Sequence, residues 1–557
     1  MSPPPDMPSR PPSDAPRPAA AFAGAIESAS ALLGSRAAAL RLLFEVRANA
    51  PGGTLAEAAL QPLRELSGDS IAACYEELLA SDADARQARG AFYTPPALGR
   101  RLVEVALEGT APDRVLDPTC GTGNLLLAAG RNLVARGVSW RDAVTRMHGV
   151  DTDEAALEIA IGRLAEVADI APGSVEHTAL RARFANADAL GDLPWRDRFD
   201  LVVGNPPFGN AIEKRTARSD DERTHYAERF PHAAVGAYDK ASLFVERSLE
   251  LAAPGGRVAL VLPRALLAAN YAVRLREWID AAHALSDVVV TEAADHFHSA
   301  AVYVSGLVVE AGANGAGDSV RVHRDDDTRA LPRPADARWS VLLSPHAALV
   351  ARLPGDWVRL DALTTIIAGA SAGEAYDFLP GVSDARPAAG WKLVTTGSVD
   401  PFRCFWGERS TRYLKHDFAT PWLTRDVVSS RRAALYDRPK VIVAGLSTEL
   451  EAMLDADGKC AGAVATIAVH DPDDDPARLA RVCAFLNSAL ARRQYLALHG
   501  AQALGGGSVQ VTKKKLGELR LPASALDTDS DFDALLEALL GAASPPPLPV
   551  AASNDRC

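Results

Sequence analysis

Short apolar runs alternate with longer stretches of helical spacing between about residues 90 and 325. The runs have the length of buried strands and are centred on Arg114–Leu116, His148–Val150, Leu201–Val203, Arg257–Leu262, Asp287–Val290 and Ala301–Val309. Alternation of buried strands with helices is typical of a parallel sheet built from strand–helix–strand units. The pattern therefore predicts an α/β domain over residues 90–325.

The flanking regions have different patterns. Residues 21–89 are rich in Ala and Leu at helical spacing, as in Ala38–Phe44 and Tyr75–Leu79, which predicts a helical N-terminal segment. Residues 338–525 show short strand-like runs and more aromatics, which predicts a second, α+β domain. We expect the remaining parts to be a disordered Pro-rich tail at 1–20, a linker at about 311–337, and a C-terminal tail at 526–557 with one short helix near Phe532–Leu540.

Composition excludes several classes of protein. Of the 557 residues, 48% are hydrophobic and 23% charged, as in soluble globular proteins. We expect no membrane association, because no apolar run reaches the roughly 18–20 residues that a bilayer span needs. The six cysteines are scattered without a Cys-x-x-Cys pair, so we expect neither a zinc site nor a disulfide framework, and a cytoplasmic location.

The net charge of −12 weighs against a nucleic-acid partner, but the charge is uneven. Residues 391–440 contain ten Lys/Arg and five Asp/Glu, a local net charge of +5. Binding to phosphate depends on local fields more than on the total. The total charge therefore weakens a DNA-binding interpretation without refuting it.

A glycine-containing segment, Asp117–Asn124, follows the first predicted strand and opens a helix at about Leu125. Glycine lets the backbone pass close to a ligand and adopt φ values that a Cβ disfavours. The acid at the strand end can accept hydrogen bonds from a ligand amino group. A dinucleotide site would place a third glycine where Leu126 stands, which disfavours NAD.

Two further acids lie near the ends of later predicted strands. Asp151 ends the strand that contains Val150, where a carboxylate can accept hydrogen bonds from both hydroxyls of a ribose. Asp188 stands ahead of the next predicted strand, where it could accept from an adenine amino group. Each acid alone could equally be a helix N-cap or a solvated loop end. Three acids placed in this way favour a nucleoside-containing ligand.

The segment Asn205-Pro206-Pro207-Phe208 directly follows an apolar strand. The prolines restrict the backbone so that the Asn205 side chain and the Pro206 carbonyl face one point, where both oxygens can accept from a planar NH₂ group. Two accepted hydrogen bonds draw the nitrogen toward sp³ character and free its lone pair to attack a methyl sulfonium. Phe208 offers a stacking surface worth roughly 1–3 kcal/mol per base. The alternative is a rigid surface turn.

These motifs, in this order, resemble those of amino-group DNA methyltransferases of the γ motif order, found in Type I and Type IIG restriction-modification systems. The resemblance implies a Rossmann-like sheet that binds S-adenosylmethionine. It assigns cofactor-binding roles to Tyr93, Thr94, Pro95, Asp117, Pro118, Cys120, Gly121, Gly123, Asp151 and Asp188. It assigns catalysis to Asn205, Pro206, Pro207 and Phe208, and contact with a flipped base to Phe297, which could instead be a plain core residue.

The C-terminal half resembles the target-recognition domains of the same group. Lys513, Lys514 and Lys515, together with Arg431 and Arg432, would contact DNA phosphates. The alternative for the three lysines is a solvated face. The aromatic side chains that could pack or wedge into DNA are Phe405, Trp406 and Tyr413.

The resemblance implies a site-specific adenine-N6 methyltransferase that acts on a flipped adenine in double-stranded DNA without a metal, with a restriction or defence-system subunit as a further partner. Methylation of a protein glutamine or an RNA guanine stays open, because those enzymes also use Asn-Pro-Pro-aromatic. A DNA-recognition subunit that needs a partner for activity is the other alternative. We expect no DNA cleavage, because no Lys precedes Lys214, whereas the N-terminal nuclease motif of Type IIG relatives requires one.

Overall fold

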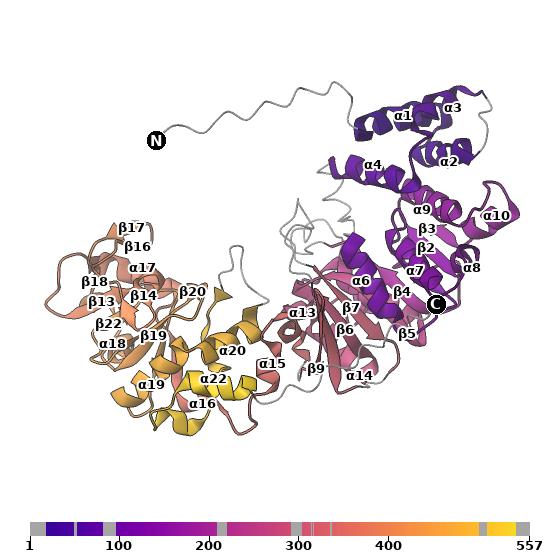
Figure 1. The fold of residues 1–557 in the computed structure, drawn as a ribbon. Helices are drawn as coiled ribbons and strands as arrows, with labels where there is room; N and C mark the ends of the chain where they lie inside the picture. The colour runs from indigo at the N-terminus through magenta and orange to yellow at the C-terminus, as the bar shows by residue number, and fades with distance from the viewer. Residues whose placement is uncertain are drawn as a thin grey trace, which may run out of the picture. The chain divides into compact units, whose positions relative to one another are not determined.

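The computed structural model describes residues 18–48, 53–81, 96–208, 220–290, 304–313, 315, 317–334, 337–500 and 509–541. Tyr93, Thr94, Pro95 and Phe297 lie outside these ranges. The chain divides into two compact units, residues 1–266 with 270–317, and residues 267–269 with 318–557. Figure 1 labels many of the helices and strands of both units. None of the described helices is long and apolar enough to cross a bilayer.

The first unit is built on a mixed sheet with the strand order β3-β2-β1-β4-β5-β7-β6. Its strands are β1 (Val115–Asp117), β2 (Met147–Asp151), β3 (Phe184–Asn186), β4 (Phe199–Gly204), β5 (Ala252–Pro263), β6 (Ala284–Val290) and β7 (Val304–Glu310). From β3 to β5 all pairs are parallel, as predicted for β1, β2, β4 and β5, whereas no strand was predicted at β3. The predicted parallel arrangement does not extend to β7, which is antiparallel to β5 and β6. An apolar run predicts a buried strand but carries no information about its direction.

The helices along this part of the chain are α6 (Pro96–Leu107), α7 (Asn124–Ala135), α8 (Trp140–Thr145), α9 (Glu154–Val167), α10 (Val175–Arg181), α11 (Asp220–Arg229), α12 (Lys240–Leu251), α13 (Ala265–Ala268) and α14 (Val273–Ala282). Of these, α6, α7, α9, α12 and α14 pack against strands of the sheet. Successive strand residues point to opposite faces, and Leu201, Val202 and Val203 of β4 are all buried. Both faces of the sheet are therefore covered at β4, as in α/β folds with a ligand site at the strand ends.

The N-terminal helical segment packs on α9 of the same unit. It comprises α1 (Pro18–Leu33), α2 (Arg36–Ala48), α3 (Leu55–Leu60) and α4 (Gly68–Ser81), drawn in indigo and violet in Figure 1. Their apolar faces form one buried cluster that includes Phe22, Leu40 and Ile71 with Ile159 of α9. This cluster anchors the segment to α9, which packs on the sheet, through apolar burial.

The region expected to be a linker contains a β-hairpin. Strands β8 (Ser319–Arg324) and β9 (Asp327–Pro332) pair antiparallel over their full length. Val320 and Val322 are buried and alternate with more exposed residues, which is the period of a half-buried strand. The many Asp and Gly residues of this region favoured a linker in the sequence-based prediction. One of them, Asp325, lies in the hairpin turn and has a φ of +50°.

The second unit contains two small sheets, with the orders β11-β23-β19-β21 and β12-β18-β13-β22. After β8 and β9, the strands of this unit are β10 (Val358–Arg359), β11 (Thr365–Ala368), β12 (Val382–Ser383), β13 (Gly390–Val394), β14 (Val399–Asp400), β15 (Arg403–Cys404), β16 (Thr411–Tyr413), β17 (His416–Phe418), β18 (Trp422–Thr424), β19 (Lys440–Ala444), β20 (Leu446–Ser447), β21 (Ala452–Asp455), β22 (Cys460–Gly462), β23 (Thr466–His470), β24 (Val509–Gln510) and β25 (Arg520–Leu521). Its helices are α15 (Ala347–Ala351), α16 (Leu360–Leu363), α17 (Ala372–Phe378), α18 (Ser430–Tyr436), α19 (Pro476–Asn487), α20 (Ala489–His499), α21 (Lys513–Gly517) and α22 (Phe532–Gly541).

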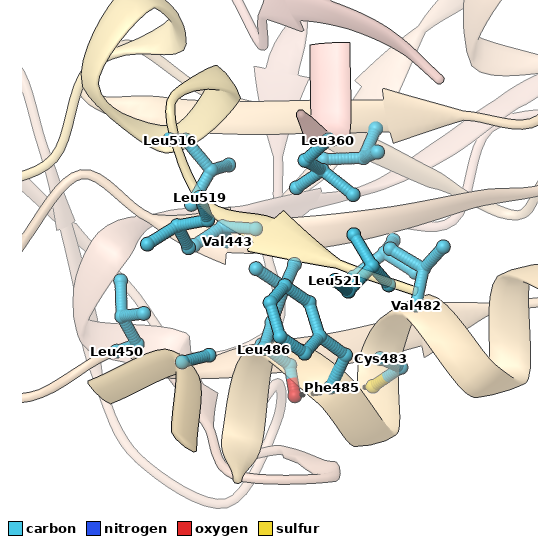
Figure 2. Close-up of a cluster of buried hydrophobic side chains, with 14 of the residues drawn as sticks. Leu360, Val443, Leu450, Val482, Cys483, Phe485, Leu486, Leu516, Leu519 and Leu521 are labelled. Atoms are coloured by element: carbon cyan, nitrogen blue, oxygen red, sulfur yellow. Dashed lines mark hydrogen bonds between the residues drawn. The ribbon is translucent and has the colours of Figure 1, made fainter. Parts of the chain in front are cut away.

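An apolar core joins the helices of the second unit to its first sheet. Figure 2 shows Phe485 and Leu486 of α19 gathered with Val443 of β19 and Leu521 of β25. Phe532 of α22 belongs to the same buried cluster. The helix expected within the C-terminal tail therefore contributes to the core of this unit.

A buried ion pair connects two strands of the first of these sheets. Lys440 and Asp455 are 1% and 6% exposed, and Lys440 Nζ lies 2.6 Å from Asp455 Oδ2. Nζ also donates to the carbonyl oxygens of Tyr436 at 2.7 Å and Arg438 at 3.1 Å. Asp455 accepts from the backbone N–H of Cys460 at 2.9 Å. The pair is thus fully hydrogen-bonded, which offsets the cost of removing both charges from water.

We predict that Lys440→Met lowers the free energy of unfolding of the second unit by about 3–5 kcal/mol, because it leaves the Asp455 carboxylate buried without its cation. Denaturant titration followed by tryptophan fluorescence measures this change. Lys459→Ala is the control, since Lys459 pairs with Asp457 on the surface and its loss should have little effect. Equal effects of the two substitutions would contradict the prediction.

Candidate functional site

Four neighbouring strand ends bring the predicted motifs together. Asp117 ends β1, Asp151 ends β2, Asp188 follows β3 by two residues, and Asn205 follows β4 directly. The strands are adjacent in the order β3-β2-β1-β4 and parallel, so their carboxyl ends lie on one edge. This edge is where ligands bind in open α/β sheets.

A cavity of about 550 Å³ opens at this edge. This is the size range of small-molecule and cofactor sites. The predicted residues that line it are Asp117, Pro118, Cys120, Gly121, Asp151, Asp188, Asn205 and Pro207. Pro206 and Phe208 are buried beside these residues, and Phe208 is only 7% exposed. The structure therefore joins the glycine-containing segment and the Asn-Pro-Pro-Phe segment at one cavity.

Backbone conformation explains the glycines of the loop. Gly121 and Gly123 have φ values of +50° and +86°, in the left-handed region that favours glycine. A Cβ on Gly123 would also lie 3.1 Å from the Cβ of Ala160 in α9. Gly123 is the residue before α7, so this turn directs the N-terminus of α7 toward the edge of the sheet. Gly123 does not itself line the cavity; it shapes the loop that does.

Asp151 links the end of β2 to this loop. Its Oδ2 accepts from the backbone N–H of Gly121 at 2.8 Å, and its Oδ1 accepts from that of Asp153 at 2.9 Å. An ionised carboxylate has about four acceptor positions. Asp151 therefore keeps acceptor capacity for ligand hydroxyls while it holds the glycine turn in place.

Burial dominates the electrostatics of the cavity. It raises the pKa of Asp117, which is 1% exposed, to about 8, and the nearby charge of Asp151 adds to this effect. A hydrogen bond of 2.9 Å from the backbone N–H of Thr119 acts in the opposite direction. Burial also raises the pKa of Asp151. Such closely spaced buried acids favour a ligand that supplies hydrogen-bond donors or positive charge.

Several lining residues were not predicted from the sequence. Lys240 and Phe244 of α12 line the cavity together with Asn205, and Leu79 of α4 reaches it from the N-terminal helical segment. Lys240 and Phe244 occupy positions one turn apart on the amphipathic helix that follows the Asn-Pro-Pro-Phe segment. That periodicity was a usable signal for one face of α12. No local signal pointed to Leu79.

The predicted phosphate contacts in the second unit have different environments. Arg431, Lys513 and Lys514 are exposed. Arg432 is partly buried; its guanidinium donates to Glu374 at 2.7 and 2.9 Å and to the Ala368 carbonyl at 2.9 Å. Its contacts are thus those of a residue that ties α18 to α17.

The remaining predicted residues of this unit are also engaged within the fold. Lys515 is partly buried at the end of the lysine triplet, and burial lowers its pKa. Tyr413 is 2% exposed, and its hydroxyl donates to the Ala375 carbonyl at 2.9 Å. Trp406 donates to the Pro421 carbonyl at 2.8 Å. In this structure Tyr413 and Trp406 therefore pack within the unit.

Comparison with known sequences gives partial matches. The chain is 28% identical over 151 residues to the Type II methyltransferase M.VspI of Vibrio sp. (strain 343), which covers 27% of this chain and 33% of that protein. It is 26% identical over 204 residues to the Type I restriction enzyme EcoEI methylase subunit of Escherichia coli, 36% of this chain and 37% of that protein. It is also 28% identical over 163 residues to a tRNA1(Val) (adenine(37)-N6)-methyltransferase of Porphyromonas gingivalis, 28% of this chain and 52% of that protein. The matches thus span about a third to a half of the relatives' lengths.

A solved structure extends the likeness of the fold. The crystal structure of the type IIG restriction endonuclease BpuSI aligns with 94% of this chain and with 72% of the BpuSI chain, with a TM-score of 0.50 and 15% sequence identity. The family model described as N-6 DNA Methylase matches residues 66–322, which include every strand end that lines the cavity. In this segment, the chain is therefore similar to the N-6 DNA methylase family.

Proposed function

We propose that this protein is a site-specific DNA methyltransferase that transfers a methyl group to the N6 amino group of adenine. The observation that carries the proposal is the position of Asn205 and Pro207 on the same cavity wall as Asp117 and Asp151. An amide acceptor for a planar amino group thus stands beside acids suited to a nucleoside-containing ligand. The match of residues 66–322 to the N-6 DNA Methylase family model supports adenine as the base.

S-adenosylmethionine fits the acceptors of the cavity, and when bound it would supply the methyl group. Asp117 would accept from the amino group of its methionine part, and Asp151 would accept from its ribose hydroxyls. Asp188, whose Oδ1 already accepts from the backbone N–H of Leu190 at 3.0 Å, has a second oxygen for the adenine amino group. Tyr93, Thr94 and Pro95 complete the proposed cofactor site.

The Asn-Pro-Pro-Phe segment would hold the target base. The Asn205 amide oxygen and the Pro206 carbonyl each accept one N6 hydrogen, which localises the lone pair on the nitrogen. Stacking on Phe208 needs one face of that buried ring to become accessible, and Phe297 would contact the other side of the base. The base must leave the duplex to reach this site, at a cost of a few kcal/mol.

The second unit is the proposed DNA-recognition part. Its exposed Arg431, Lys513 and Lys514 suit phosphate contacts, and Arg432 and Lys515 would join them only by giving up contacts within the unit. The relatives named as Type I and Type II enzymes support a place in a restriction-modification or phage-defence system, with a further subunit as a partner. An RNA substrate is the second candidate, because one relative is a tRNA adenine methyltransferase.

Asn205→Ala should reduce methyl transfer to DNA by about 100- to 1,000-fold, the usual effect of removing one side chain that stabilises developing charge. Transfer from labelled S-adenosylmethionine to DNA, RNA and protein, followed by mass spectrometry of nucleosides and peptides, measures the rate and locates the methyl group. Asn270→Ala is the control, because Asn270 is exposed. Full activity of Asn205→Ala, or a methyl group on RNA or protein alone, would refute the proposal.

Cofactor binding should weaken as the pH falls. With its pKa near 8, Asp117 carries a proton at lower pH and must lose it before it can accept from a cationic amino group. We expect the Kd for S-adenosylmethionine to rise about tenfold between pH 7 and pH 6. Calorimetric titration at several pH values measures this dependence. Asp117→Asn should make the Kd nearly independent of pH over this range, while Asp151 is unchanged. A pH dependence of the Kd in this variant equal to that of the wild type would contradict the role given to Asp117.

Lys513→Ala and Lys514→Ala should each weaken binding to duplex DNA of any sequence. If each lysine neutralises one phosphate, the slope of log Kobs against log[salt] should become shallower by about 0.9 per substitution. Fluorescence anisotropy over a range of salt concentrations gives these slopes. Lys459→Ala serves as an exposed control outside the predicted set. Slopes identical to that of the control would show that the lysines form only a solvated face.

A further inference from the structure

Helix α4 contacts the cofactor loop through a polar network. Glu76 of α4 accepts two hydrogen bonds at its Oε1, from Thr122 Oγ1 at 2.6 Å and from Asn124 Nδ2 at 3.0 Å. Thr122 and Asn124 flank Gly123, and both line the cavity. One carboxylate from the N-terminal helical segment therefore holds both sides of the left-handed turn.

An arginine connects the same turn to α4 a second time. Arg163 of α9 is 6% exposed. Its Nη1 donates to the Thr122 carbonyl at 2.7 Å and to Asn124 Oδ1 at 2.8 Å, and its Nη2 donates to Asp69 Oδ1 in the first turn of α4 at 2.6 Å. The turn is thus held by Glu76 directly and by Asp69 through Arg163.

A third contact reaches the other side of the cavity. Tyr75 of α4 is 2% exposed, and its hydroxyl donates to Asp153 Oδ2 at 2.9 Å. The backbone N–H of Asp153 donates to Asp151 Oδ1. Neighbouring residues of α4, Tyr75 and Glu76, therefore support the two segments that carry the glycine turn and the proposed ribose-binding acid.

This network is not needed to dock the helix. The apolar cluster of Phe22, Leu40, Ile71 and Ile159 already packs the N-terminal helical segment on α9. Burial raises the pKa of Glu76, so keeping this carboxylate at the interface has a cost, which the donors from Thr122 and Asn124 counter. A partly buried acid with two donors from one loop is best explained by what it does to that loop.

We propose that Glu76 is a positioning residue for the cofactor: it keeps the turn at Gly123 in its binding conformation before the ligand arrives. Gly121 and Gly123 give this loop more backbone freedom than other residues would, and ordering it on binding would cost affinity. The N-terminal helical segment is then part of the cofactor site. The inference rests on the proposed function in taking S-adenosylmethionine as the ligand.

Glu76→Ala in the full chain should raise the Kd and the KM for S-adenosylmethionine about tenfold, because Thr122 and Asn124 lose their shared acceptor. The kcat at saturating cofactor should stay within about threefold, since Glu76 touches no reacting atom. Glu76→Gln keeps an Oε1 acceptor and should recover most of the affinity. Glu77→Ala is the matched control, because Glu77 is the exposed neighbour on α4.

Hydrogen–deuterium exchange without cofactor gives a readout that does not depend on activity. Amides of residues 119–124 should exchange faster in Glu76→Ala than in Glu77→Ala, whereas those of the apolar cluster on α1 and α2 should be unchanged. Equal loop exchange and equal Kd in the two variants would overturn the inference. If wild-type protein did not bind S-adenosylmethionine, the proposed function would fail instead, and faster loop exchange in Glu76→Ala would still identify the positioning role.

Discussion

The hydrogen bond from the Gly121 N–H to the Asp151 carboxylate joins the ends of two neighbouring strands. A second bond, from the Cys120 N–H to the Val150 carbonyl at 2.9 Å, runs beside it. Together they turn the chain back over the sheet edge, and this requires the left-handed conformation of the following glycines. The shape of the cavity and the direction of α7 depend on this turn, while the parallel pairing of β1 with β2 brings Asp117 close to Asp151.

Burying acids at such a turn is costly, and the fold contains several groups that reduce the cost. Backbone N–H groups donate to Asp117 and Asp151, and each donor favours the charged form. Asp117 nevertheless keeps a raised pKa. The sheet thus supplies the acids of the site, and α4 and α9 support the loop beside them. Residues far apart in the chain therefore act together on the electrostatics of one cavity. Apolar packing docks α4, while its polar side chains act on the loop.

In the second unit, positive charge serves two purposes. Lys440 and Arg432 are engaged in pairs with Asp455 and Glu374, whereas Arg431, Lys513 and Lys514 are exposed. The local net charge of +5 over residues 391–440 therefore overstates the charge available to a partner. Counting charges along the chain cannot separate these roles, because pairing depends on which strands and helices meet. The excess of basic residues still favours the proposed DNA contact, but fewer of these residues are exposed than the count along the chain suggests.

The sequence by itself determined the strands β1, β2, β4 and β5 and the acids and Asn205-Pro206 near the strand ends, because apolar runs, glycines and an Asn-Pro pair are local features, whereas the short strand β3 was not predicted. Only the tertiary structure decided the antiparallel insertion of β7 and the burial of Lys440. It also decided that Glu76 meets Thr122, across 46 positions of the chain. Such contacts follow from the packing of α4 on α9, and no local pattern encodes which distant residue a side chain will meet.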